Sequence, residues 1–173
     1  MKLHSSTHVV EKSGNFEENQ FSIEASAKAF MILSDGLYSN KILAVVRELS
    51  TNAYDSHVDA GVADRPFEVH LPTRLEPYFH VRDYGTSMTH DQCMTLYTTY
   101  FRSTRNDSND AVGCLGLGSK APFAYADSFT VEAFNDGEKR VYAAHRDSNG
   151  SPTFCLMDTV PTEEKNGIKV SLP

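Results

Sequence analysis

The longest amphipathic stretch of the chain lies between residues 39 and 61. Its apolar residues recur three and four positions apart, which is the spacing of one face of an α-helix. Ser39 and Asn40 are both suitable N-caps, and Gly61 is well placed just past the C-terminal end. The pattern therefore predicts a long helix with one buried face. That face comprises Ile42, Val45, Val46, Leu49 and Ala53.

Shorter helical patterns occur at three other places. Residues 28–33 predict a short helix, and a helix of about three turns is expected to begin after Thr89, a suitable N-cap. Residues 119–126 predict a third, with Pro122 in its first turn, where a missing N–H is tolerated. Most of the remaining sequence alternates like strands.

Alternation at period two predicts paired strands in residues 65–73 and 76–85, each with one core face. Toward the C-terminus, four apolar runs are separated by Gly-containing turns, which predicts an antiparallel meander. These runs are residues 128–134, 139–146, 153–157 and 168–172. Residues 16–25 alternate weakly and are expected to form an edge strand.

Chain length and composition indicate one globular domain. The chain has 173 residues, of which 40% are hydrophobic and 23% charged, so it can bury a substantial core. We expect a single domain over residues 1–173 of the α+β class. Its predicted architecture is a two-layer sandwich, with a mixed, mainly antiparallel sheet and helices on one face.

Composition also excludes several classes of protein. No apolar run is long enough for a membrane span, and the N-terminus lacks the apolar region of a signal peptide, so we expect a cytoplasmic protein. Cys93, Cys114 and Cys155 are widely spaced and are expected to be reduced thiols rather than zinc ligands. The net charge of −7 argues against direct nucleic-acid binding by this segment.

One stripe of the long helix is polar. Glu48, Asn52, Asp55 and Asp59 lie at offsets of zero, four, seven and eleven, and no Lys or Arg supports them at i,i+4. Carboxylates and an amide oxygen are hard ligands of the kind that Mg²⁺ accepts beside waters and phosphates. A solvated polar face explains the stripe equally well, so the stripe alone does not decide.

Two further segments have residues suited to ligand binding. Asp83 leaves a strand into a Gly turn, where its carboxylate could point into a cleft or simply form an Asx-turn. Residues 113–120, GCLGLGSK, place three glycines before a helix, an arrangement suited to phosphate oxygens or to a flexible loop without ligand. The spacing fits neither a P-loop nor a Rossmann fingerprint.

Taken in order, these segments resemble the boxes of a known superfamily. RELSTNAYD (47–55) resembles the ExxxNxxD box, DYGTSM (83–88) the DxGxG box and GCLGLGSKAPF (113–123) the GxxGxG box of the GHKL ATPases. These include gyrase B, the ninety-kilodalton heat-shock chaperone, MutL and the sensor histidine kinases. NGIKVSLP (166–173) resembles the fourth box. The resemblance covers about residues 20–173 and implies the Bergerat ATP-binding fold.

The resemblance implies a role for each matching residue. Glu48 would be the general base that activates water, Asn52 would hold Mg²⁺, and Asp83 would accept a hydrogen bond from the adenine amino group. Asp59 has no counterpart and is expected to be a solvated carboxylate outside the site. The residues implied in nucleotide binding are Asn52, Asp55, Asp83, Gly85, Met88, Gly113, Leu115, Gly116, Leu117, Gly118, Ser119 and Lys120.

The resemblance also implies how the parts are divided. Residues 1–15 would form an N-terminal arm and residues 89–120 an ATP lid closing over the triphosphate. A Glu four residues before the Asn matches the hydrolase branch. The sequence after the glycines is most similar to the phage rapid-lysis proteins of the rIIA type, which would place the protein in the host cytoplasm.

Two positions depart from the family pattern. Ser87 replaces the second Gly of DxGxG and adds a side chain beside the expected adenine pocket, while Ile168 stands where the family often has Thr. Many of these ATPases take a positive charge for the γ-phosphate from a following domain, which this segment lacks. Lys120, Arg102 or Arg105 could substitute for it.

The expected function is binding of ATP with Mg²⁺ and slow hydrolysis, gated by lid closure or by association. The expected partners are an adenine nucleotide and either a second copy of the chain or another protein. The alternative is a non-hydrolysing module of the same fold that responds to nucleotide. A protein without a ligand, in which the glycines and acids are structural, is a third interpretation.

Overall fold

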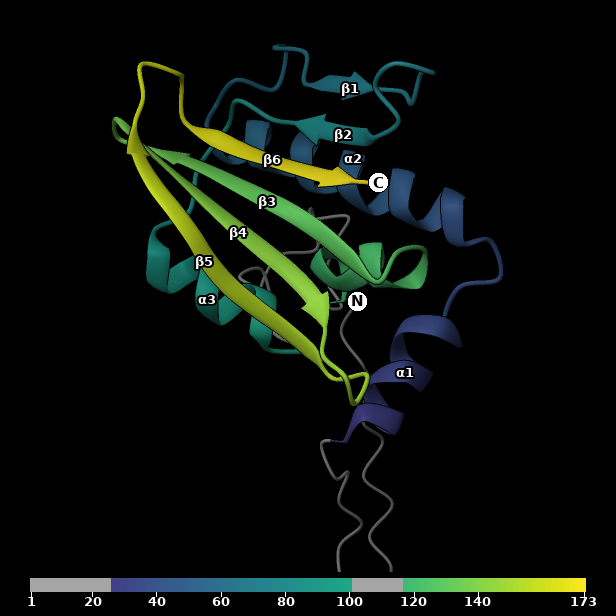
Figure 1. Cartoon of the computed structure of the whole chain (residues 1–173). Helices are drawn as coiled ribbons and strands as arrows, with labels where there is room; N and C mark the ends of the chain where they lie inside the picture. The colour runs from purple at the N-terminus through teal and green to yellow at the C-terminus, as the bar shows by residue number, and fades with distance from the viewer. Residues whose placement is uncertain (1–25, 101–116) are drawn as a thin grey trace, which may run out of the picture.

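The computed structural model describes residues 26–100 and 117–173. Three α-helices and one 3₁₀-helix accompany six strands in this part of the chain (Figure 1). The helices are α1 (Ala27–Asp35), α2 (Lys41–Asp59), α3 (His90–Thr98) and η1 (Gly118–Ala124). The strands are β1 (Glu68–His70), β2 (Phe79–Arg82), β3 (Ser128–Asn135), β4 (Glu138–Arg146), β5 (Pro152–Pro161) and β6 (Gly167–Leu172).

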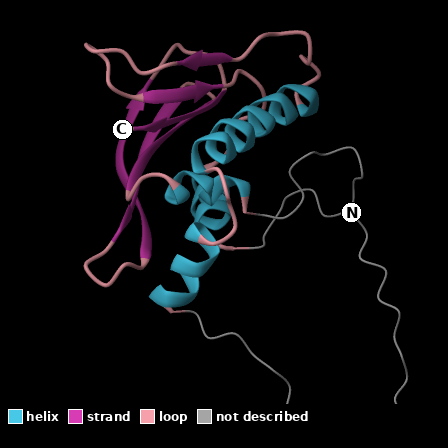
Figure 2. Ribbon diagram, turned by 90° about the vertical axis from the view of Figure 1, so that its right-hand side faces the viewer, coloured by secondary structure: helices cyan, strands magenta, loops and turns pink. Residues whose placement is uncertain are grey.

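The six strands form one sheet in the order β1-β2-β6-β3-β4-β5. Neighbouring strands are antiparallel throughout the described sheet, without the parallel pair that a mixed sheet would contain. The helices lie together on one face of it, as Figure 2 shows edge-on. The predicted α+β class and the one-sided helices are therefore confirmed, whereas the described sheet is antiparallel rather than mixed.

The predicted meander is correct for β3, β4 and β5 but wrong for β6. Strand β6 lies between β2 and β3, with Val170 opposite both Val81 and Val131. The reason is burial. Ile168, Val170 and Leu172 alternate along β6 and are all buried, and the central position places this strand under α2.

The helix ends follow the predicted caps. The Asn40 side chain accepts from the Leu43 amide at the start of α2, and Gly61 has a φ of +70° just past its end. Thr89 caps α3 in a capping box with Gln92. Short-range chemistry therefore placed these boundaries correctly.

The predicted helix at residues 119–126 differs in type. It is the 3₁₀-helix η1, and Pro122 is its fifth residue rather than part of the first turn. Proline has no N–H for an i→i−4 bond, so an α-helix would lose a bond here. The 3₁₀ pattern instead uses bonds such as that from the Lys120 amide to the Leu117 carbonyl, 2.9 Å.

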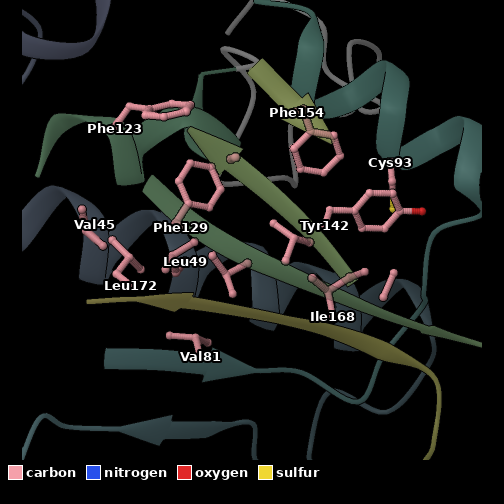
Figure 3. Close-up of a cluster of buried hydrophobic side chains, with 14 of the residues drawn as sticks. Val45, Leu49, Val81, Cys93, Phe123, Phe129, Tyr142, Phe154, Ile168 and Leu172 are labelled. Carbon is pink, nitrogen blue, oxygen red and sulfur yellow. The ribbon is translucent and has the colours of Figure 1, made fainter. Parts of the chain in front are cut away.

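The core lies between the sheet and the helices. Figure 3 shows side chains from several elements pointing into it, among them Leu49, Phe129, Tyr142 and Ile168. Cys93 is also buried there, and both it and Cys155 are free thiols, as predicted. One continuous cluster therefore joins the helix layer to the sheet.

Two expected core faces are only partly buried. On α2, Val45, Leu49 and Ala53 are buried, whereas Ile42 is 63% exposed, and Val46 is also exposed. Val69 on the edge strand β1 and Leu71 just past its end are exposed, because α2 packs against β2 and β6 instead. The periodicity of the sequence identified these apolar faces but did not show which of their residues the neighbouring elements cover.

The predicted edge strand at residues 16–25 lies outside the described residues, as does Cys114. Within the ranges 26–100 and 117–173, the helices fall short of the length and apolarity required to cross a bilayer.

Candidate nucleotide-binding site

A cavity of about 1020 Å³ lies between α2, the loop after β2, helix α3 and the start of η1. This volume is large enough for a ligand of nucleotide size. Several residues predicted from widely separated segments of the sequence lie together on its wall. They are Glu48, Asn52, Asp83, Met88, Leu117, Gly118 and Ser119.

Asp83 lies at the buried end of the cavity, held by three donors. Its Oδ1 accepts from the Ser56 hydroxyl at 3.0 Å and from the Gly85 amide at 3.1 Å, and its Oδ2 accepts from the Ile168 amide at 3.1 Å. A carboxylate has about four acceptor positions, so these donors leave one on Oδ2. Burial raises the pKa of Asp83, while the three hydrogen bonds oppose that rise by favouring the ionised form.

Gly85 is needed here for close approach. A Cβ at this position would lie 2.3 Å from the Ser56 carbonyl oxygen and 2.5 Å from its hydroxyl. The Thr86 amide also donates to the Ser56 carbonyl, at 3.3 Å. The turn after β2 thus packs on the backbone of α2, which positions Asp83 relative to that helix.

His57 fixes the same turn from the next position on α2. Its buried ring accepts from the Tyr84 amide at Nε2, 2.7 Å away, so Nδ1 carries the proton and donates to the Arg65 carbonyl at 2.8 Å. Neither His57 nor Ser56 was identified from the sequence as part of the site. Ser56 could have been found, because it lies four residues after Asn52 on the polar stripe.

Glu48 lies at the other end of the cavity. Its Oε1 is 2.6 Å from the guanidinium of Arg47, which is largely exposed while the Glu48 side chain is not. The stripe lacks a base at i,i+4, but the adjacent residue supplies the cation. A Cβ on Gly118 would lie 2.8 Å from Glu48 Oε2 and 3.6 Å from the amide nitrogen of Asn52, so the last glycine of the Gly-rich segment contacts this stripe.

Lys120 lies apart from the cavity wall in the described structure. Its side chain is only 4% exposed and lies off the cavity wall, with Nζ donating to the carbonyls of Leu96 and Thr99 at 2.6 Å each. These carbonyls belong to the C-terminal end of α3, which lacks intrahelical donors and attracts cations. Burial lowers the pKa of Lys120 to about 8.

The two remaining acids of the stripe are placed differently from expectation. Asp59, expected outside the site, lies on the cavity wall, whereas Asp55 is buried and is not part of that wall. The described residues contain no cluster of three or more His, Cys, Asp or Glu side chains suited to a metal. Any metal here would need ligand or water oxygens as well. Gly113, Leu115 and Gly116 lie outside the described residues.

The two departures from the family pattern both lie on the cavity wall. The Ser87 hydroxyl donates to the Gly167 carbonyl at 3.2 Å, so it ties the loop after β2 to the start of β6. Ile168 is buried and adds an apolar surface beside Asp83.

Comparisons with known proteins give two distant relatives and no matching family model. The chain is 24% identical over 179 aligned positions to the chaperone protein HtpG of Mycolicibacterium vanbaalenii, and 26% identical over 178 to that of Rhodococcus jostii. These alignments cover 88% and 86% of the chain but only 27% of each relative. The chain therefore spans about a quarter of their length. The similarity is thus a distant one to part of HtpG chaperones, and it gives no support to the rapid-lysis proteins.

Proposed function

We propose that this domain binds ATP with Mg²⁺ in the cavity beside α2 and hydrolyses it slowly. The observation that carries the proposal is the buried Asp83 carboxylate, which keeps an acceptor position on Oδ2 at one end of a cavity of nucleotide size. Glu48 and Asn52 line the same cavity. The distant similarity to HtpG chaperones supports the same class of ligand.

Asp83 would recognise the base. An ionised carboxylate accepts hydrogen bonds, so its remaining position suits the exocyclic amino group of adenine. Met88, Val81 and Ile168 line the cavity nearby and offer apolar contact to a flat ring. Asp83 is held by backbone amides, so it needs little reorganisation when the base binds.

Glu48 and Asn52 would act at the phosphates. Glu48 would take a proton from an attacking water, and the 2.6 Å ion pair with Arg47 helps to hold its carboxylate in place. Asn52 offers an amide oxygen of the kind that Mg²⁺ accepts. Four acids line this wall, and their negative charges cannot neutralise the phosphates: Glu48, Asp59, Asp83 and Asp91. The metal would supply the positive charge that neutralises the phosphates.

We also propose a role for the rest of the domain and for a partner. The described sheet and helices would form the GHKL ATP-binding fold as one domain, with residues 89–120 acting as a lid. A second copy of the chain or another protein would then respond to the bound nucleotide. The closer likeness to phage rapid-lysis proteins stays a prediction from sequence.

A non-hydrolysing nucleotide module is the second candidate. It is favoured by the position of Lys120, which donates to α3 instead of facing the cavity, so the described wall offers only Arg47 as a cation for the γ-phosphate. Phosphoryl transfer depends on such positive charge. Binding without turnover would follow.

The test is titration with ATP and Mg²⁺, followed by measurement of phosphate release. Asp83→Asn should weaken binding at least about 100-fold, because the substitution puts an amide donor opposite the amino group. Glu48→Ala should leave binding intact and lower turnover at least about 100-fold. A wild-type protein that binds no adenine nucleotide would refute the proposal. Binding without turnover in the wild type would favour the second candidate.

A further inference from the structure

We infer that Ser56 is the positioning residue that orients the Asp83 carboxylate so that Oδ2 faces the ligand. This inference rests on the proposed binding of adenine by Asp83. Ser56 is not one of the residues that the three sequence boxes assign to nucleotide binding, and it comes from α2 rather than from the turn that carries Asp83.

The geometry places one hydroxyl between two parts of the cavity wall. Ser56 Oγ lies 3.0 Å from Asp83 Oδ1 and 2.9 Å from the Thr86 carbonyl oxygen. Both Ser56 and Thr86 line the cavity, and Ser56 itself is buried. A hydroxyl has a single proton, so it donates to one of these two acceptors at a time.

The backbone leaves the Ser56 hydroxyl little freedom to move away. The turn after β2 approaches so closely that even a Cβ on Gly85 would contact Ser56 Oγ. With the Gly85 amide, the hydroxyl places two donors on Oδ1, while Oδ2 receives the Ile168 amide alone. The carboxylate therefore presents its remaining acceptor position through Oδ2.

The hydroxyl also favours the ionised carboxylate. Burial raises the pKa of Asp83, and the hydrogen bond from Ser56 lowers it together with the amides and the Arg82 charge. Among the other titratable groups near Asp83, Tyr84 follows it in the chain, and the buried His57 on α2 binds the Tyr84 amide. Tyr97 on α3 senses the charge of Asp83, and Asp59 lines the cavity on α2. Neither donates to Asp83 in the described structure, so Ser56 is its side-chain donor.

The test compares two ligands that differ by the amino group alone. Dissociation constants are measured with Mg²⁺ for ATP and for purine riboside triphosphate, which lacks the 6-amino group. Ser56→Ala should weaken the binding of ATP about 10-fold and the binding of purine riboside triphosphate less than about 2-fold, because the second ligand makes no hydrogen bond to Asp83. Ser50→Ala, the same change on α2 away from the cavity wall, should leave both unchanged.

A pH profile gives a second measurement. Without the hydroxyl the pKa of Asp83 rises further, so ATP affinity of Ser56→Ala should fall at a higher pH than that of the wild type as the solution is acidified. Ser56→Cys fills the same space with a weak donor and gives the same ligand comparison if the alanine variant is too unstable.

Three results would overturn the inference while the proposed function stands. They are equal losses for both ligands, an unchanged ATP affinity, and an unshifted pH profile, each in a protein whose wild type binds ATP and whose Asp83→Asn variant does not. A wild type that binds neither ligand would instead refute the proposed function.

Discussion

The two ends of the cavity are built differently. At the Asp83 end, backbone amides and a buried hydroxyl hold the carboxylate, and α2 contacts the turn of Gly85 backbone to backbone. At the Glu48 end, the contacts are made by side chains. Arg47 is 66% exposed, and the atoms nearest to a Cβ on Gly118 are at the ends of the Glu48 and Asn52 side chains.

This difference separates recognition from reaction. Groups held by the backbone are already oriented and need little reorganisation when a ligand binds. Exposed side chains can change conformation, and salt weakens their charge interactions. The Asp83 end should therefore depend on the integrity of the fold. The Glu48 end should depend on small local changes and on ionic conditions.

The largest expected effect is that of Gly85→Ala. The new methyl would lie 2.3 Å from the Ser56 carbonyl, so α2 and the turn must separate. We expect a loss of about 3 kcal/mol in the free energy of unfolding, measured by urea denaturation, and loss of ATP binding. A variant as stable as the wild type would show that the Asp83 end is not rigid.

Lys120→Met should give the next largest effect, and it depends on pH. In the folded protein the pKa of Lys120 is about 8, below its unfolded value of 10.5. Between these values the unfolded state binds more protons, so wild-type stability rises with pH through this window. Relative to Lys120→Met, the wild type should gain about 2 kcal/mol between pH 7.5 and 10.

The measurement for Lys120 is urea unfolding at several pH values. Lys28→Met on α1 is the matched control, because its side chain is exposed, and its offset from the wild type should stay constant. Since Lys120 ties η1 to α3, Lys120→Met should also disturb the Glu48 end more than the Asp83 end. If the free energies of unfolding of both variants differ from the wild type by an amount that does not change with pH, the Lys120 charge is not buried.

Gly118→Ala should give the smallest effect and is the direct counterpart of Gly85→Ala. Its methyl would meet the end of the Glu48 side chain at 2.8 Å, and that side chain can turn aside. We expect unchanged stability, unchanged ATP affinity and about a 10-fold lower rate of phosphate release. If Gly118→Ala unfolds the protein as Gly85→Ala does, the two ends are equally rigid.

The sequence predicted most elements because their causes are local. Caps such as Asn40 and Thr89 act within one helical turn, and the Asp136-Gly137 turn takes the positive φ values that its residues favour. The central place of β6 was not predicted, because strand order depends on which strand the helix layer covers. Its apolar residues fit either a central strand or the end of a meander.

The candidate site was predicted only in part, for a related reason. Motif order led to Glu48, Asn52 and Asp83, and the structure places all three on one cavity wall. Ser56 and His57 were missed because their roles arise from a turn 27 residues away in sequence. The bonds from Lys120 to the end of α3 were not predicted, because its sequence context does not reveal the helix end beside it.

By itself, the sequence determined the α+β class, the helix boundaries and the acids and glycines that suggest a nucleotide. These depend on short-range periodicity, capping and residue chemistry. Tertiary structure alone decided which donors hold Asp83, that Asp59 rather than Asp55 lines the cavity, and that Lys120 faces α3. Those outcomes depend on contacts between residues far apart in the chain. Local sequence allows several positions for each of these side chains, and tertiary packing selects one of them.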